Sequence, residues 1–370
     1  MLVTIIIFVV VLGLLVFVHE LGHFIVARRF GVRVDEFGFG FPPRLFGIRR
    51  GETLYSINLI PLGGFVRIKG EAGDNSADTD SFSHKKAWQR SSILAAGVAM
   101  NFIFAFVILS VGFMIGTPQE VSDEDIATRA VRDINLVIID VAKGSAGDEA
   151  GLRPGDRLRA INGIHFSSVD DATNYIKKHN TETLQVSSSR GDSLNDFDIQ
   201  PRVISGSETP VIGIGMIRAG LVTYNFFEAW WRGARATISL VYAILLAFGA
   251  LIAGLFRGTG VGDQISGPVG VAVLTGQIAK LGVPYLINFT AMLSINLGIL
   301  NIIPFPALDG GRVLFIVIEK IKGRPLNPRI ESVFHSIGFF LLIALVAFIT
   351  YKDVTRYGIQ ILNSFTGLIN

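Results

Sequence analysis

Cysteine is absent from this sequence, and charged residues are scarce. The missing thiols exclude disulfides, thiolate metal sites and cysteine nucleophiles, but they leave the redox compartment open. Only 17% of the 370 residues are charged, whereas 50% are hydrophobic, and the mean hydropathy is +0.51. The net charge of +3 provides no strong field for nucleic acid, so no nucleic-acid partner is expected. This composition is typical of a multi-pass membrane protein.

Long apolar runs divide the chain. Residues 2–27 form the first run, which as a helix would be about 39 Å long and would exceed the roughly 30 Å hydrocarbon core of a bilayer. Further candidate spans are residues 93–116, 285–318 and 333–350. The basic excess of residues 28–90 marks that region as cytoplasmic, which puts the amino end of the chain outside.

The apolar run at residues 236–256 does not fit this topology as a single crossing. If the second span ends outside and the third span begins outside, the chain between them must cross an even number of times. We therefore expect residues 236–256 to lie at the interface or to re-enter the membrane, paired with the turn at Ser266, Gly267 and Pro268.

Residues 117–218 have a different character, with charges, Ser-Gly turns and short alternating runs. The patterns predict strands at 136–141, 157–161, 184–189, 197–201 and 211–217, and a helix at 170–179. The stretch 144–156, Gly-Ser-Ala-Gly-Asp-Glu-Ala-Gly-Leu-Arg-Pro-Gly-Asp, followed by Ile161-Asn162-Gly163, resembles a PDZ domain. We expect one such soluble domain on the outer side.

The motif His19-Glu20-Leu21-Gly22-His23 places two imidazoles one turn apart on one face of the first span. This spacing suits a tetrahedral zinc ion, with Glu20 as the general base. The alternative is a pair of core histidines satisfied by hydrogen bonds. Three ionisable residues inside one span favour the zinc site, because such groups are costly in lipid and are usually functional.

A third zinc ligand is expected at Asp309, the acidic residue within the apolar run 285–318. His19 and Asp309 lie at roughly similar depths in two spans that both run from outside to inside, given the helix-loosening prolines before Asp309. The alternative role for Asp309 is a helix-end cap, which Gly310 and Gly311 would also suit. A carboxylate at membrane depth needs a partner, so we favour the ligand.

Together these motifs resemble those of the bacterial site-2 proteases, of the kind that includes the regulator of sigma-E protease. The resemblance covers nearly the whole chain and rests on the HExxH motif, the run Pro61-Leu62-Gly63-Gly64-Phe65-Val66, the PDZ-like stretch, Gly267-Pro268, and the run Asn301-x-x-Pro-x-Pro-x-Leu-Asp309-Gly-Gly. It implies an intramembrane zinc endopeptidase acting on single-pass substrates such as anti-sigma factors or signal-peptide remnants. The sigma-E type carries two tandem PDZ domains, whereas this chain has room for one, so its particular substrate does not transfer.

Substrate binding is expected at an edge strand. A helical substrate must unwind before it is cut, and its freed backbone groups then need partners within the hydrocarbon. The alternating residues 63–69 follow a glycine pair and could pair with an extended substrate through Gly64, Phe65, Val66 and Arg67. A plain hairpin at the membrane surface is the alternative. Asn301 could donate to the oxyanion or the substrate backbone, or it could form an interhelical hydrogen bond.

The expected fold is a multi-pass α-helical membrane protein with about four transmembrane helices, a cytoplasmic-side membrane-associated β region and an inserted extracytoplasmic α/β PDZ domain. The expected segments are a first span (1–30), a hairpin or re-entrant region (31–90), a second span (91–116), the PDZ domain (117–219), an interfacial or re-entrant segment (220–283), a third span (284–319), a cytoplasmic loop (320–332), a fourth span (333–351) and an extracytoplasmic tail (352–370). One Zn²⁺ per chain, membrane lipid and single-pass membrane proteins are the expected cofactor and partners, in the bacterial inner membrane.

Two alternatives concern the PDZ domain. It could gate the enzyme by size, or it could capture a substrate carboxyl terminus at a nest of backbone N–H groups formed by Gly213 and Gly215. In a second functional class, the chain would be a membrane scaffold with a non-catalytic zinc site. That class predicts the loss of Glu20 or Asp309, and both are present.

Overall fold

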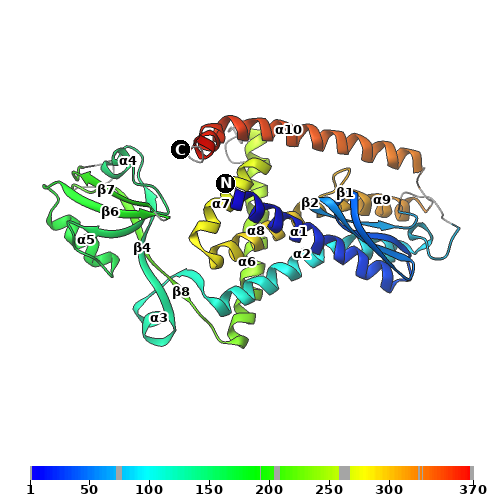
Figure 1. The fold of residues 1–370 in the computed structure, drawn as a ribbon, viewed down its shortest axis with the longest axis horizontal. Coiled ribbons are helices and arrows are strands. Elements are labelled where there is room, and N and C mark those ends of the chain that lie inside the picture. Colours follow the sequence, from blue (N-terminus) through cyan, green and yellow to red (C-terminus); the bar gives the residue numbers. More distant parts are fainter. Residues whose placement is uncertain are drawn as a thin grey trace. The chain divides into compact units, whose positions relative to one another are not determined.

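The computed structural model describes residues 2–71, 77–191, 193–203, 209–257, 267–323, 326 and 328–366. The chain divides into two compact units (Figure 1). The first, here the helical unit, comprises Met1–Leu109, Gly233–Ala279 and Leu286–Asn370, and the second, here the PDZ-like unit, comprises Ser110–Arg232 and Lys280–Tyr285. Each unit is described by itself.

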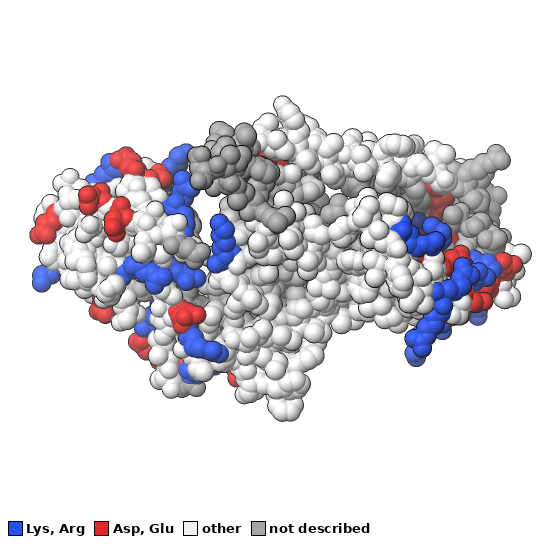
Figure 2. Space-filling view, viewed as in Figure 1, with Lys and Arg blue, Asp and Glu red and all other residues white. Residues whose placement is uncertain are grey.

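Long helices dominate the helical unit. They are α1 (Leu2–Arg29), α2 (Ala87–Ile115), α6 (Phe226–Arg257), α7 (Pro268–Leu281), α8 (Val283–Ile302), α9 (Asp309–Lys322) and α10 (Pro328–Thr366). Among the described residues, five helices are long and apolar enough to cross a membrane, namely those containing Val3–Arg29, Ala87–Ile115, Phe226–Gly254, Val283–Ile302 and Ile330–Thr355. Figure 2 shows that charged side chains of this unit gather at the end where α1 finishes, while the surface over the long helices is largely uncharged.

Two helical regions bear on the expected segments. Residues 236–256, expected as an interfacial or re-entrant segment, lie within the continuous 32-residue helix α6, which no proline or turn interrupts. Ser266, its expected pairing partner, lies outside the described residues. The expectation of one span over residues 285–318 was wrong, because α8 ends at Ile302 and α9 begins at Asp309. Pro304 and Pro306 lack the N–H groups that a continuous helix would need.

Side chains from several helices pack together in the interior of the helical unit. Ala105 and Leu109 of α2 contact Ala291, Ile295 and Ile299 of α8 in one buried apolar cluster, against which side chains of α6 also pack. A second buried cluster joins the end of α1 to the start of α2. These contacts hold α1, α2 and α8 together next to the polar residues described below.

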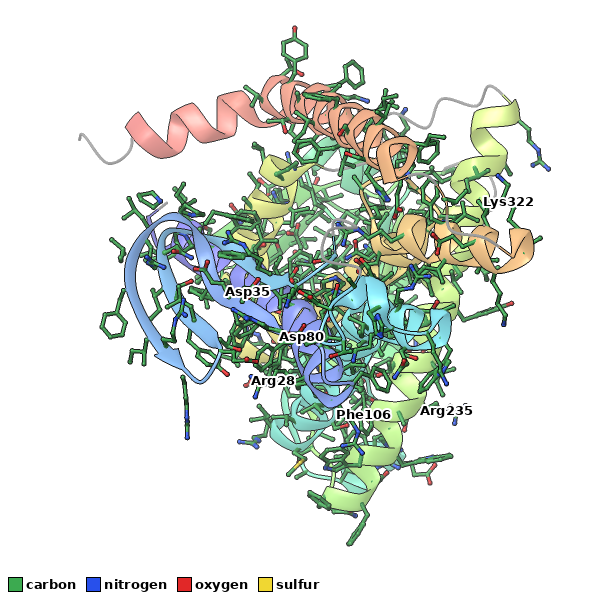
Figure 3. All side chains as sticks on the ribbon, turned by 90° about the vertical axis from the view of Figure 1, so that its right-hand side faces the viewer. Arg28, Asp35, Asp80, Phe106, Arg235 and Lys322 are labelled. Atoms are coloured by element: carbon green, nitrogen blue, oxygen red, sulfur yellow. The ribbon has the colours of Figure 1, made fainter. Side chains whose placement is uncertain are left out.

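A long antiparallel hairpin follows α1 and consists of β1 (Val34–Arg50) and β2 (Thr53–Ile68). The pair is folded back on itself, so that Phe37 of β1 lies opposite both Val66 and Tyr55 of β2. The start of β2 is thereby tied to the end of α1, because Arg28, labelled in Figure 3, donates to Thr53 Oγ1 at 3.1 Å and Thr53 in turn donates to the Val34 carbonyl at 2.8 Å. The far half of the hairpin exposes a set of large apolar side chains, Phe41, Leu45, Phe46, Ile48, Ile57, Leu59 and Ile60. Apolar surface of this size is typical of a lipid or protein contact.

The PDZ-like unit is built on a six-stranded antiparallel sheet with the order β3-β8-β4-β5-β6-β7. Its strands are β3 (Thr117–Glu120), β4 (Val131–Val141), β5 (Arg157–Ile161), β6 (Leu184–Arg190), β7 (Ser193–Ile199) and β8 (Ile214–Val222), and its helices are α3 (Asp123–Thr128), α4 (Ala146–Ala150) and α5 (Val169–Lys178). Ile138, Ile161, Leu184 and Val186 are fully buried in its core. Because strands alternate their side chains, these apolar positions face α5 and α4 while polar neighbours face solvent.

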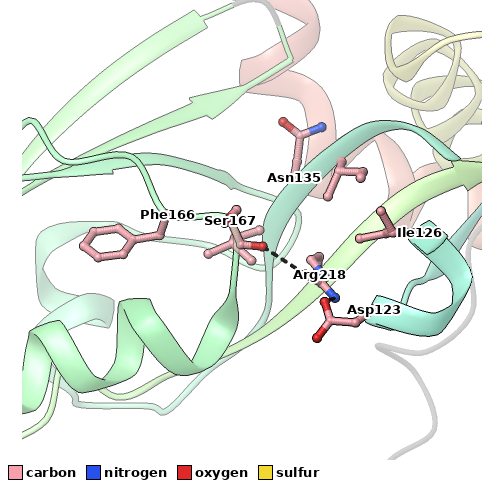
Figure 4. Close-up of a pocket in the computed structure, with 8 residues that line it drawn as sticks. Asp123, Ile126, Asn135, Phe166, Ser167 and Arg218 are labelled. Carbon is pink, nitrogen blue, oxygen red and sulfur yellow. Dashed lines mark hydrogen bonds and ion pairs between the residues drawn. The ribbon is translucent and has the colours of Figure 1, made fainter.

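One cavity of roughly 440 Å³ lies in the PDZ-like unit (Figure 4). Phe166, Ser167 and Arg218 line it, together with residues of α3 and β4. The Arg218 guanidinium donates to the Ser167 carbonyl at 3.4 Å and pairs with Asp123. Arg218 therefore bridges β8 to the loop that precedes α5.

Candidate metal centre

Helix α1 presents two imidazoles to the interior of the helical unit. His19 and His23 are each only 6% exposed, and their Nε2 atoms lie 3.2 Å apart. The four-residue spacing places both side chains on the same helix face. Val11, Leu15 and Val18 are buried on the same stripe, which shows why this face of an apolar helix turns inward.

Asp309 completes the cluster from the first residue of α9. Its Oδ2 atom lies 3.0 Å from His19 Nε2 and 3.3 Å from His23 Nε2. These three residues are the group of potential metal ligands found among the described residues, with ligand atoms all within 4.8 Å of one another. Ligands at zinc-like distances in a tetrahedron lie roughly 3.3 Å apart, so the donor set fits a zinc ion.

The glycines after Asp309 explain how it reaches this position. A Cβ on Gly310 would lie 2.3 Å from the Ile302 carbonyl oxygen, and one on Gly311 would lie 2.3 Å from the Phe305 carbonyl oxygen. No side chain fits in either space, so the first turn of α9 packs directly against the backbone at the end of α8. Gly310 and Gly311 are therefore required for packing, next to the candidate ligand Asp309.

Neighbouring groups orient both imidazoles. His23 Nδ1 lies 2.8 Å from the Ile93 carbonyl oxygen, and His19 Nδ1 lies 3.2 Å from Asn101 Nδ2. Asn101 is fully buried on α2, and its Oδ1 has no hydrogen-bond partner within the described structure. Rotating the Asn101 side-chain amide by half a turn exchanges Nδ2 and Oδ1 and places Oδ1 next to Nδ1 of His19. Oδ1 then accepts a hydrogen bond from the N–H at Nδ1, which a histidine carries when its Nε2 binds a metal.

Gly97, also on α2, leaves room for the imidazoles. A Cβ at this position would lie 2.4 Å from His23 Nε2 and 2.7 Å from His19 Cε1. Any larger residue would therefore occupy the space of the ligand atoms. Sequence reasoning missed both Gly97 and Asn101, although Asn101 was visible as a strongly polar residue in the apolar run 93–116.

Glu20 lies outside this cluster. Its Oε2 accepts a hydrogen bond from the backbone N–H of Val66 in β2 at 3.1 Å. Gly64 lies beside it, because a Cβ built there would be 3.9 Å from Glu20 Cγ. The outer edge of β2 is thus brought next to the candidate base, with Gly64 and Val66 on the same side of the strand.

The other predicted substrate residues are arranged differently. Phe65 is partly buried and packs across the hairpin, since a Cβ on Gly38 would lie 2.5 Å from its ring. Arg67 is 67% exposed and lies 3.7 Å from Glu36 of β1. Asn301 lies, partly exposed, in the last turn of α8. The structure thus brings Gly64 and Val66 to Glu20, but directs Phe65 and Arg67 elsewhere.

The comparisons with known proteins agree with this chemistry. The profile of Peptidase family M50 matches residues 7–345. The chain is 31% identical to the zinc metalloprotease RasP of Bacillus licheniformis, over 95% of this chain and 99% of that protein. It is also 31% identical to the regulator of sigma-W protease RasP of Bacillus subtilis, over 95% and 98% of the two chains. The PDZ domain of an SdrC-like protein from Listeria monocytogenes matches 24% of this chain and 92% of its own, at 25% identity and a TM-score of 0.22.

The buried two-histidine, one-carboxylate cluster and the relatives of matching length define a zinc metalloendopeptidase with several apolar helices able to span a membrane. The chain belongs to peptidase family M50, the site-2 protease family. The expected resemblance and the expected zinc cofactor are thereby confirmed. The alternative of a scaffold without catalysis is not supported, because the family is one of enzymes and Glu20 is in place.

Proposed function

We propose that this protease hydrolyses peptide bonds within the membrane-spanning segments of single-pass proteins. One observation carries the proposal: His19, His23 and Glu20 lie well inside α1, a helix able to span a membrane, and Asp309 lies beside them. His19 is roughly 24 Å along the helix from Val3, and Arg28 and Arg29 follow at its end. A substrate therefore has to reach the cluster at membrane depth, toward the end marked by basic residues.

In the proposed mechanism, His19, His23 and Asp309 hold the zinc ion, and Glu20 moves protons. Zinc bound there acidifies water and polarises a carbonyl. Glu20 takes a proton from the attacking water on its carboxylate and returns it to the leaving nitrogen. Asn101 and the Ile93 carbonyl keep both imidazoles oriented. Asn301 is proposed to donate to the substrate backbone or to the developing oxyanion.

The outer edge of β2 is proposed to hold the unwound substrate as an added strand. The Val66 N–H, which would pair with a substrate carbonyl, donates to Glu20 in this structure. Pairing with a substrate would therefore transfer this donor from Glu20 to the substrate. Glu20 would then lose a stabilising partner and become available for the water. Gly64, beside Glu20, would let the substrate backbone come close.

The proposed location is the bacterial inner membrane, with the end of α1 and the hairpin on the cytoplasmic side. The gathering of charged side chains at that end supports this orientation (Figure 2). The expected cytoplasmic loop at 320–332 and extracytoplasmic tail at 352–370 belong to the same proposal. Arg324 in that loop lies outside the described residues. The B. subtilis relative is named a regulator of sigma-W protease, which supports a regulatory membrane protein as substrate class.

The PDZ-like unit is proposed to act as a size gate for substrate outer domains. Capture of a peptide along β8 is less well supported, because Arg218 spans from β8 to Ser167 and Asp123. A peptide lying in that space would have to break these contacts (Figure 4). Gly213 has a φ of +78°, as one residue of a backbone nest can have.

The test is to reconstitute the purified chain with a single-pass reporter lacking an outer domain. Mass spectrometry of the fragments should place the cut within the apolar segment of the reporter. Glu20→Gln should give no such fragments at equal protein and zinc content. Cuts found only in the soluble flanks of the reporter would overturn the intramembrane proposal while leaving the metalloprotease assignment intact.

A further inference from the structure

Helix α10 makes one close contact with the loop that precedes Asp309. The backbone N–H of Ala307 donates to Nδ1 of His335 at 3.0 Å, across 28 residues of chain. Ala307 has a φ of +76°, in the left-handed region that residues with a Cβ rarely adopt. This strained loop residue is therefore held by a side chain from a different helix.

Gly338 brings α10 to the loop. It lies three residues after His335, on the same helix face, and a Cβ there would be 2.1 Å from Cβ of Pro306. Over residues 330–355 of α10, the buried residues are Gly338 and Asp353. The contact at Pro306 and Ala307 is thus a narrow one in a largely exposed helix, and it positions the imidazole over the Ala307 N–H.

The loop transmits its position to Asp309. Leu308 donates to the Phe305 carbonyl at 3.2 Å, and Gly311 donates to the Leu308 carbonyl at 3.1 Å. Gly310 and Gly311 are packed too tightly against the preceding backbone to admit a side chain. Asp309 is the first residue of the helix that this loop begins, so a shift of Ala307 shifts the carboxylate.

We propose that His335 is a positioning residue for the metal centre, which by accepting the Ala307 N–H fixes the loop that aims Asp309 at the two imidazoles. The inference rests on Asp309 being a metal ligand. His335 must carry its proton on Nε2, because Nδ1 acts as the acceptor. Glu331, one turn earlier, lies 4.0 Å from Nε2, and the ring of Phe315 packs against the imidazole with centroids 5.5 Å apart.

Two substitutions separate the acceptor from the bulk of the side chain. His335→Leu fills the space but cannot accept a hydrogen bond, whereas Asn in His335→Asn carries Oδ1 close to the position of Nδ1. Purified full-length protein loaded with zinc is challenged with excess chelator, and the rate of zinc release is measured. Substitutions of groups that orient metal ligands typically cost about 10-fold or more in metal affinity. His335→Leu should release zinc faster by about that factor, and His335→Asn should behave like the native chain.

Two further variants complete the test. Val333→Ala, at a position 58% exposed on α10, should leave zinc release unchanged. Gly338→Ala, which pushes α10 away from Pro306, should accelerate release as His335→Leu does, and it keeps the test decisive if His335→Leu fails to fold. Absorption spectra of the cobalt-loaded proteins should shift in the two fast-releasing variants only.

Equal release rates and spectra for His335→Leu, Gly338→Ala and the native chain would overturn the proposal. Fast release from His335→Asn as well would show that hydrogen-bond acceptance is not what His335 contributes, and would overturn it too. Asp309→Asn distinguishes the underlying assignment: unchanged zinc content in that variant would show that Asp309 is not a ligand, whatever the His335 variants do.

Discussion

The proposed metal binding and the proposed proton transfer involve different side chains at this site. The ligand atoms of His19, His23 and Asp309 lie within 4.8 Å of one another, whereas the Glu20 carboxylate is held by the Val66 N–H. An amide in place of the Glu20 carboxylate keeps an oxygen to accept that N–H but cannot take a proton from water. Loss of an imidazole instead removes a ligand from the cluster itself.

We therefore expect Glu20→Gln to retain one zinc per chain and to lose proteolysis by about 100-fold or more, the range associated with general acid–base catalysis. His23→Ala should lose zinc. Metal analysis of the purified variants, together with cleavage assays, checks both expectations. Stoichiometric zinc in His23→Ala would remove His23 from the ligand set.

At the residue scale, the sequence was most informative where the spacing of residues is local. The four-residue separation of His19 and His23 predicts their common helix face directly. Asp309 could be predicted because a carboxylate in an apolar run needs a partner. The need for a glycine at position 97 could not be predicted, since it depends on how closely α2 approaches α1. Asn101 could be recognised as a costly polar residue in an apolar run, but its contact with His19 could not be predicted, because the two residues are 82 positions apart.

At the scale of elements, β2 is the strand whose edge meets the active site. Its residue Val66 pairs with Phe37 of β1 on one side and donates its N–H to Glu20 on the other. A proline in place of Val66 would remove this donor, whereas alanine would keep it. The metal ligands belong to α1 and α9 and do not depend on that N–H.

Val66→Pro should therefore retain zinc and lose cleavage, by up to about 10-fold if the hydrogen bond that the Val66 N–H would donate to a substrate carbonyl is worth roughly 0.5–1.5 kcal/mol. Val66→Ala is the matched control and should cleave nearly as the native chain does. Zinc content and cleavage of the reporter are measured for both at equal expression. Ordinary activity of Val66→Pro would argue against a role for the β2 edge.

Element boundaries were predictable only where local chemistry decides them. The expected strand at residues 157–161 coincides with β5, which is closed by the Asn162-Gly163 turn. The last strand was expected at 211–217 but runs from Ile214 to Val222, because its end pairs with β3, a strand that local patterns did not indicate. The break between α8 and α9 follows from Pro304 and Pro306, which the sequence analysis treated as loosening one helix.

At the scale of the whole molecule, short connections join the sheet of the PDZ-like unit to α2 and α6. Helix α2 ends at Ile115, just before β3 begins at Thr117, and β8 ends at Val222, shortly before α6 begins at Phe226. In addition, β3 and β8 pair with each other, with Glu120 opposite Ala219. The chain therefore enters and leaves this sheet through one antiparallel pair. This pair provides a natural point at which the rest of the unit can be removed.

Deletion of residues 121–218, with Glu120 joined to Ala219 through Asn-Gly, should close β3 and β8 as a hairpin, since this turn suits directly facing strands. The metal ligands and Glu20 lie outside the deleted segment, so zinc should stay bound. If the unit is a gate, the deleted protein should cut reporters with intact outer domains as well as trimmed ones, while the native chain cuts only the trimmed form. Loss of cleavage of trimmed reporters, with zinc still bound, would instead favour peptide capture.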